Sequence, residues 1–202
     1  MIDFVAVFIF FFAVIDPIGT VPVFLAVTNG FAAKAKRKIA VQATLVAMLI
    51  LVFFVAVGEI LLTALNIPLL AFQIAGGLVL FIFAMSMIFG ESKPDEELRL
   101  IGKESETAIF PLAVPSLASP GAMLAAVLLT ENHRFNLWEQ AQTTLVMLVV
   151  LTIALLLMLG ASWIHRFIGN SGASVISRVM GLILASVAVS NVLAGVKEYF
   201  AL

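Results

Sequence analysis

Long apolar runs separated by short polar connectors make up most of the chain. Six runs are each about as long as a helix must be to cross a bilayer, roughly 20 residues. They cover residues 4–28, 39–62, 68–89, 109–130, 137–160 and 174–195. The pattern therefore predicts an all-α integral membrane protein with six transmembrane helices in one membrane domain, residues 1–202.

The first run is interrupted near its middle by Asp16 and Pro17. Proline removes a helical hydrogen bond, and a charged side chain at this depth costs at least about 2.5 kcal/mol on the insertion scales. Asp is also a favoured N-cap, and Pro is favoured at the first position of a helix. We therefore expect residues 4–15 and 17–28 to form two half-helices, with Asp16 capping the second. Transporters of small solutes build binding sites at such broken helices.

The fourth run contains the same kind of interruption. Pro111, Pro115 and Pro120 make one continuous helix improbable. Ser119 is a favoured N-cap directly before the third proline. The sequence thus predicts that the first and fourth helices are both broken in the middle of the membrane.

Shifting the chain against itself indicates an internal repeat. A shift of 103 residues places Asp16-Pro17 on Ser119-Pro120. A shift of 104 places residues 77–80 on 181–184, Ala84 on Ala188 and Ser86 on Ser190. We expect two three-helix repeats, about 1–90 and about 108–202, joined by a cytoplasmic linker at about 91–107. Because three spans is an odd number, the second repeat would be inverted in the membrane.

Composition supports the membrane assignment. Hydrophobic residues make up 63% of the chain and charged residues only 11%, whereas about a quarter of a typical soluble protein is charged. The absence of cysteine excludes disulfides. The chain has no H-E-x-x-H motif and no nucleophile elbow, which disfavours a membrane enzyme. We expect no catalytic residues, no metal site, no cofactor and no nucleic-acid partner.

Basic residues are unevenly distributed among the connectors. Even-numbered connectors carry only Arg134, and the C-terminal tail carries Lys197. Odd-numbered connectors carry Lys34, Lys36, Arg37, Lys38, Lys93, Arg99, Lys103 and Arg166. The positive-inside rule then places the odd connectors in the cytoplasm and both termini outside. The expected location is a plasma membrane, either the bacterial inner membrane or the archaeal cell membrane.

Inversion of the repeats would bring the N-termini of both half-helices to the same depth. Each N-terminus presents unpaired N–H groups and about half a positive charge, which suits an anionic group such as a carboxylate. The candidate substrate-binding residues are Asp16, Pro17, Gly19, Thr20, Ser116, Ser119, Pro120 and Gly121. Secondary candidates are Gln73, Ser86, Arg178, Ser190 and Asn191.

Each candidate also has a purely structural interpretation. Asp16 could act only as a cap, or could also meet a substrate ammonium group or a coupling cation. The hydroxyl of Thr20 could simply bond back to its own helix. Arg178 could extend toward the interface or pair with a helix C-terminus. The remaining polar candidates could hold helices together, and the glycines could allow close packing.

Several stretches resemble signature motifs of the MarC family of membrane proteins. They are residues 16–24 in the first helix, 74–77 in the third, 111–115 with 119–121 in the fourth, and 176–181 in the sixth. One departure is Ser119, where many relatives have Gly before Pro-Gly. The family includes a branch described as small neutral amino acid transporters and is similar to amino acid exporters of the LysE type. The resemblance therefore implies a small amino acid as cargo.

The residues and the resemblance together favour a secondary transporter, for uptake or export, of small neutral amino acids such as glycine and alanine. Asp16 is titratable, so H⁺ or Na⁺ are the candidate coupling ions, and one repeat would rock against the other. Three alternatives remain open: a non-transporting scaffold or stress-response protein, an exporter of another small solute, and a passive pore. The lipid bilayer is an expected partner, and self-association into a homo-oligomer is compatible with the sequence.

Overall fold

The computed structural model describes residues 2–89, 108–132 and 134–200, and within them the regular elements are all helices. The predicted linker at 91–107 lies outside the described residues. The helices are α1 (Phe4–Ile15), α2 (Thr20–Val27), α3 (Ala33–Ala64), α4 (Leu69–Phe89), η2 (Ala108–Leu117), α7 (Pro120–Leu128), α8 (Leu137–Leu159) and α9 (Ala161–Tyr199).

The spans agree with the predicted all-α membrane fold. Five are long and apolar enough to cross a membrane: Phe4–Val27, Ala33–Ala64, Leu69–Phe89, Leu137–Leu159 and Ser174–Tyr199. A sixth consists of η2 and α7, which are bent by 55° at the break between them. The all-helical fold and the break in the fourth span are thus confirmed.

The last helix begins earlier than the sequence pattern suggests. Helix α9 starts at Ala161, but its backbone leaves the helical conformation at Gly169, where φ is +63°. Glycine adopts this left-handed region without the steric cost that a side chain brings. The part that qualifies as a membrane span starts at Ser174, which is the predicted position.

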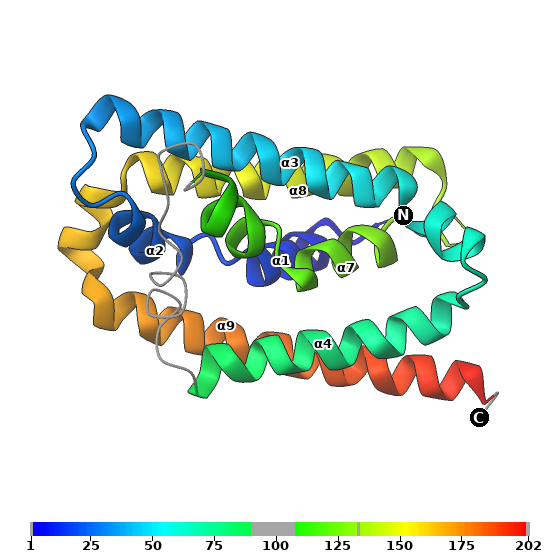
Figure 1. Ribbon diagram of the computed structural model, residues 1–202. Coiled ribbons are helices and arrows are strands. Elements are labelled where there is room, and N and C mark those ends of the chain that lie inside the picture. Colours follow the sequence, from blue (N-terminus) through cyan, green and yellow to red (C-terminus); the bar gives the residue numbers. More distant parts are fainter. Residues whose placement is uncertain (1, 90–107, 133, 201–202) are drawn as a thin grey trace.

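Three layers of helices form the molecule (Figure 1). Helices α3 and α8 pack against each other on one side, and α4 and α9 on the other. The broken spans, α1–α2 and η2–α7, lie between these pairs and contact both. In each outer pair the two helices run in opposite directions, as do the two broken spans (Figure 1).

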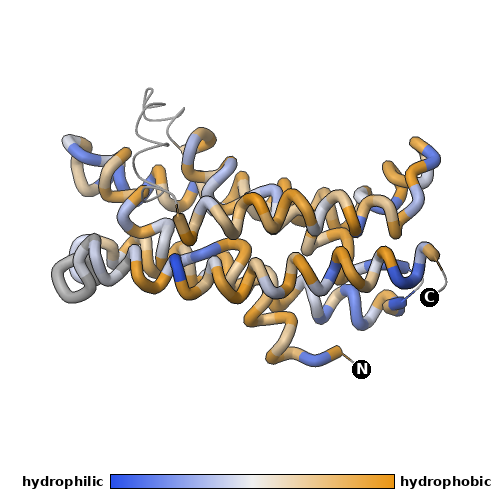
Figure 2. Tube along the Cα trace, turned by 90° about the horizontal axis from the view of Figure 1, so that it is seen from below, coloured by the Kyte–Doolittle hydropathy of each residue, from blue (hydrophilic) through white to orange (hydrophobic). Residues whose placement is uncertain are grey.

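Burial follows this layering. In an 18-residue window of the first span 56% of the residues are buried, compared with 22% in such windows of the α3, α4 and α9 spans and 33% in α8. The outer helices therefore present apolar side chains to lipid, while the broken spans are enclosed by protein. Hydrophobic positions fill the middle of the bundle, and most hydrophilic ones gather toward its two ends (Figure 2). This is the distribution a bilayer requires.

Two glycines allow the close contact between α4 and α9. A Cβ atom added to Gly77 would lie 3.1 Å from the backbone oxygen of Ala188. A Cβ atom added to Gly181 would lie 3.0 Å from the backbone oxygen of Ala84. Small residues at such positions let membrane helices approach closely. Gly77 and Gly181 therefore serve the packing of α4 against α9.

Candidate functional site

The first break is organised by Asp16. Its backbone adopts a left-handed conformation, with φ +48° and ψ +65°, and its N–H donates to the Phe12 carbonyl. A residue before proline is disfavoured in the right-handed helical region, and Asp tolerates the left-handed one better than most residues. Helix α1 therefore ends at Ile15 and Asp16 becomes its C-cap.

The prediction that Asp16 caps a second half-helix starting at Pro17 needs correction. Helix α2 starts three residues later, at Thr20, and Gly19 is its N-cap residue. The Asp16 side chain nevertheless accepts a hydrogen bond from the Gly19 N–H, with Oδ1 3.0 Å from the nitrogen. The Asp16 carbonyl accepts from both the N–H and the hydroxyl of Thr20. Asp16 thus bridges the end of α1 and the start of α2.

The second break has the predicted cap. Ser119 is extended, and its Oγ accepts a hydrogen bond from the Ala122 N–H at 3.1 Å, with Pro120 in the first turn of α7. Upstream, η2 contains two residues with non-helical backbone angles, Phe110 and Val114. Each directly precedes a proline, which explains the departure from a helix.

The two breaks are in direct contact. The Ser119 hydroxyl donates to the Val14 carbonyl at 2.8 Å, so the residue that caps α7 also satisfies the last turn of α1. The hydroxyls of Thr20 and Ser116 lie 3.4 Å apart. A Cβ atom added to Gly121 would come within 3.5 Å of the Val14 side chain. The two interruptions seen in the sequence therefore lie side by side in the fold.

The junction of the two breaks, formed by Asp16, Thr20, Ser116 and Ser119, is sealed from solvent. The exposed fraction is 1% for Asp16 and Ser116 and 0% for Thr20 and Ser119. Such a cluster of polar groups between membrane helices is costly unless its members hydrogen-bond to one another. The contacts just described supply those bonds, and they make the junction a preorganised polar site in an apolar bundle.

A third element, α9, also reaches the junction. The Ser177 hydroxyl donates to Oδ2 of Asp16 at 3.2 Å. A Cβ atom on Gly19 would lie 2.7 Å from the Ser177 Oγ and would overlap the Asp16 carboxylate, so only glycine leaves room for this contact. Sequence reasoning singled out Arg178 and overlooked its neighbour Ser177. The available signal was the position of Ser177 within the sixth-helix motif.

The other candidates lie in different environments. Pro17, Gly19 and Gly121 are buried at the junction, whereas Pro120 is exposed. Three secondary candidates are exposed and are not among the junction contacts described: Ser86, Arg178 and Ser190. Ser86 bonds back to the Phe83 carbonyl of its own helix.

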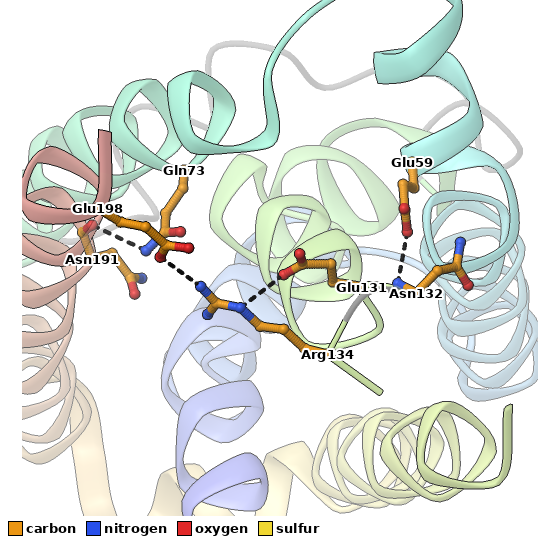
Figure 3. Close-up of polar contacts among 7 residues, drawn as sticks. All are labelled: Glu59, Gln73, Glu131, Asn132, Arg134, Asn191 and Glu198. Carbon is orange, nitrogen blue, oxygen red and sulfur yellow. Dashed lines mark hydrogen bonds and ion pairs between the residues drawn. The ribbon is translucent and has the colours of Figure 1, made fainter. Parts of the chain in front are cut away.

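A second polar cluster lies at one end of the bundle (Figure 3). Arg134, in the connector between α7 and α8, pairs with Glu131 at 3.2 Å and with Glu198 of α9 at 3.0 Å. Glu59 of α3 accepts a hydrogen bond from the Asn132 N–H at 2.8 Å. Glu59 therefore ties α3 to this connector.

Gln73 and Asn191 join the two helices of one outer pair. The Gln73 side chain, on α4, donates to the Asn191 carbonyl, on α9, at 3.2 Å. These two secondary candidates therefore hold helices together. Within the described residues, no three His, Cys, Asp or Glu side chains come together as a metal site would require.

Comparison with known proteins assigns the family. The profile described as MarC family integral membrane protein matches residues 1–200. A UPF0056 membrane protein of Methanocaldococcus jannaschii is 31% identical over 197 residues, covering 96% of each chain. UPF0056 membrane protein YvbG of Bacillus subtilis is 31% identical over 201 residues, covering 97% of this chain and 95% of its own. YhcE of Escherichia coli is 31% identical over 208 residues, covering 98% and 95%.

No solved structure matches the chain. The relatives come from both bacteria and archaea, and the similarity extends over nearly the full length of each. The helical spans agree with the membrane character that all these names carry. The chain is a multi-pass integral membrane protein, consistent with a plasma membrane, and it belongs to the MarC family.

Proposed function

We propose that this protein is a secondary transporter of small neutral amino acids, such as glycine and alanine. The observation that carries the proposal is the buried junction where two broken spans, running in opposite directions, bring polar groups into contact. A helix break costs stability in a membrane, since it frees backbone groups that lipid cannot satisfy. Two such breaks placed together are what a binding site for a polar solute requires.

The groups at the junction match the two charged ends of an amino acid. Helices α2 and α7 both begin there, at Thr20 and Pro120. Helix N-termini favour a carboxylate through their N–H groups and dipoles. The Asp16 carboxylate suits the ammonium group, and the hydroxyls of Thr20 and Ser116 supply neutral hydrogen-bonding partners. Glycine and alanine, which have the smallest side chains, would need the least additional space at this closely packed junction.

In this proposal the buried junction corresponds to the occluded conformation of the transporter. The junction hydroxyls bond to neighbouring protein groups, and the four polar residues are almost completely buried. On binding, a substrate would replace some of these protein–protein bonds with bonds of its own. Because each lost protein–protein hydrogen bond is replaced by a bond to the substrate, no buried polar group is left without a partner. This limits the free-energy cost of opening the junction.

Reciprocal contacts between α4 and α9 support an inverted repeat. Gly77 of α4 approaches the Ala188 carbonyl of α9, and Gly181 of α9 approaches the Ala84 carbonyl of α4. The shift of 104 residues that relates Gly77 to Gly181 also relates Ala84 to Ala188. A two-fold relation between the halves would allow alternating access by rocking, with H⁺ or Na⁺ coupled through Asp16. In this proposal the odd connectors face the cytoplasm of a bacterium or archaeon.

Uptake of labelled alanine and glycine into proteoliposomes under an H⁺ or Na⁺ gradient tests the proposal. Wild type should accumulate substrate, and Asp16→Ala should lose affinity by roughly 10–100-fold, the loss expected for a hydrogen bond to a charged group. Ser186→Ala is the matched control, because Ser186 is exposed on α9 and bonds back to the Leu182 carbonyl. Flux that only equilibrates would indicate a pore instead, and no flux of either substrate would contradict the proposal.

A non-transporting scaffold is the second candidate, and one observation favours it. The polar groups described at the junction are bonded within the protein, including Ser119 to Val14 and Ser177 to Asp16. A scaffold needs no more than that. It predicts that single cysteines at Thr20 or Ser116 stay inaccessible to small water-soluble thiol reagents under all conditions, whereas a transporter exposes them intermittently.

A further inference from the structure

The first turns of α3 carry four closely spaced basic residues. Lys34, Lys36, Arg37 and Lys38 fall within five positions. None of them makes an ion pair within the described parts of the chain. Positive charge at a helix N-terminus is unfavourable, because the helix dipole is positive there. An anion close to these basic residues would offset the repulsion.

The length of α3 places this basic segment at the level of the lipid headgroups. The 20 residues 39–58 contain no charged residue, and Lys38 and Glu59 bracket them. At about 1.5 Å per residue this uncharged stretch is about 30 Å long, which matches the hydrocarbon thickness of a bilayer. The basic turns therefore begin where the hydrocarbon ends, at the depth of the phosphates.

The basic residues are divided between two faces of the helix. Lys34 and Lys38 are exposed and lie in register with an exposed apolar stripe formed by Val41, Leu45 and Leu49. Steps of three or four residues connect these positions, so they share one face. Leu49 is 71% exposed and Leu45 51%, which marks this face as the one that meets lipid chains.

Lys36 belongs to the opposite face. It is half-buried and lies one turn before Ala40, followed at helical spacing by Ala43, Ala47 and Leu51, which are all fully buried. Lys36 therefore faces the protein side, although it carries the same charge in the same connector as Lys38. Arg37 is exposed, next to Lys38.

We propose that the lipid-facing side of α3 is a binding site for an anionic phospholipid. The headgroup phosphate is held by Lys34, Arg37 and Lys38, and an acyl chain lies along Val41, Leu45 and Leu49. Phosphatidylglycerol has the required chemistry, whereas phosphatidylcholine carries a neutralising cation. This site is independent of the transport proposal, because it uses none of the residues at the junction.

Native mass spectrometry of the full-length protein with equal amounts of phosphatidylglycerol and phosphatidylcholine tests the site. Wild type should retain phosphatidylglycerol about tenfold more than phosphatidylcholine. Each of Lys34→Gln and Lys38→Gln should weaken this retention about fivefold, the change that corresponds to about 1 kcal/mol per basic residue near an anionic surface. Lys38→Arg should retain the lipid as well as wild type does.

Lys36→Gln is the matched control. It removes the same charge from the same connector as Lys38→Gln, so any effect on membrane orientation is the same for both. It should leave retention within about twofold of wild type. Equal retention of the two lipids by wild type, or an equal loss in Lys36→Gln and Lys38→Gln, would overturn the proposal.

A competition experiment distinguishes a lipid-binding site from a site for a soluble phosphate. Millimolar glycerol phosphate should leave bound phosphatidylglycerol in place, because it lacks the acyl chain that packs on the apolar stripe. Complete displacement would show that the basic residues form a site for a soluble anion and would contradict the lipid assignment. Thermal unfolding gives a second readout: phosphatidylglycerol should raise the melting temperature of wild type and Lys36→Gln more than that of Lys38→Gln.

Discussion

The Ser177 hydroxyl on α9 donates a hydrogen bond to the Asp16 carboxylate in the break of the first span, at 3.2 Å. The two residues are 161 positions apart in the sequence. The bond connects a helix of the outer α4–α9 pair with the enclosed layer of broken spans. It also gives the carboxylate a donor in addition to the Gly19 N–H, which bonds to its other oxygen. A relative movement of the two layers therefore changes the environment of Asp16.

Removing this bond should affect substrate affinity more than folding. Ser177→Ala deletes one donor to a charged group, so the KM for alanine uptake should change by roughly tenfold, the equivalent of about 1.5 kcal/mol. Ser177→Thr, which keeps a hydroxyl, should recover much of the wild-type value. Ser186→Ala removes a hydroxyl from the exposed side of the same helix and should behave like wild type. Equal KM values for Ser177→Ala and Ser186→Ala would contradict a role for Ser177 at the junction.

Adding one methyl group at Gly19 should disturb the junction from inside. Gly19 has an ordinary right-handed backbone conformation, with φ −66°, so alanine is compatible with the backbone. The new Cβ would overlap the Asp16 carboxylate and crowd the Ser177 hydroxyl. We expect Gly19→Ala to lower the free energy of unfolding by about 1–3 kcal/mol and to abolish uptake. In Gly76→Ala the three atoms nearest to the new Cβ would all belong to the apolar Leu124 side chain rather than to a polar group of the junction, so this control should disturb uptake less. Denaturation in detergent micelles measures the stability of both variants, and uptake into proteoliposomes measures their activity.

Much of the fold could be predicted because the signals are local. A span of about 20 apolar residues with polar flanks is recognisable without knowledge of its neighbours, and the predicted fifth span, 137–160, differs from α8 by one residue. The interruptions at Asp16 and Ser119 were also local signals, since a cap residue before proline identifies a helix start. What the local rule missed is that Asp16 adopts a left-handed conformation and delays α2 until Thr20.

The contacts between distant segments could not be predicted in this way. Hydrophobic periodicity says which face of a helix is buried but not which helix covers it. The bonds from Ser177 to Asp16 and from Asn132 to Glu59 depend on tertiary packing. The layer order, with both broken spans enclosed, likewise follows from how six apolar helices share their surfaces. Composition alone does not distinguish an enclosed apolar helix from one that faces lipid.

The hydrogen bonds of the Ser119 side chain and the preference of its residue type for the N-cap position should contribute separately to the free energy of unfolding. Ser119→Ala leaves the Ala122 N–H without its cap and the Val14 carbonyl without its donor, and we expect a loss of about 2 kcal/mol. Ser119→Gly loses the same side-chain bonds, but glycine is nearly as good an N-cap residue, so it should be more stable than the alanine variant by about 0.5–1 kcal/mol. Ser119→Thr keeps the hydroxyl and should lie nearest to wild type. Thermal or chemical unfolding of the three variants gives the ranking, and an alanine variant as stable as the threonine one would contradict it.

The two ion pairs of Arg134 should differ in strength. The side chain of Glu131 is only 9% exposed, whereas that of Glu198 is 58% exposed, so solvent screens the second pair more. Double-mutant cycles with Arg134→Gln, Glu131→Gln and Glu198→Gln should yield a coupling of about 1 kcal/mol for the first pair and about 0.3 kcal/mol for the second. Raising the salt concentration should weaken the Glu198 coupling first. A larger coupling to Glu198 than to Glu131 would show that burial does not set the order.

The orientation predicted from the basic residues can be tested with single cysteines, because the chain contains no cysteine of its own. Ala33 lies beside Lys34 at the start of α3, and Leu65 lies at the other end of the same helix; both are exposed. The positive-inside rule predicts that the end with Lys34, Arg37 and Lys38 faces the cytoplasm. In intact cells a membrane-impermeant maleimide should therefore label Leu65→Cys and leave Ala33→Cys unlabelled, while permeabilised cells should allow labelling of both.

Labelling of Ala33→Cys alone in intact cells would show the opposite orientation, with both chain termini in the cytoplasm. Labelling of both would indicate two populations of opposite orientation, in which the four basic residues do not determine how the chain inserts.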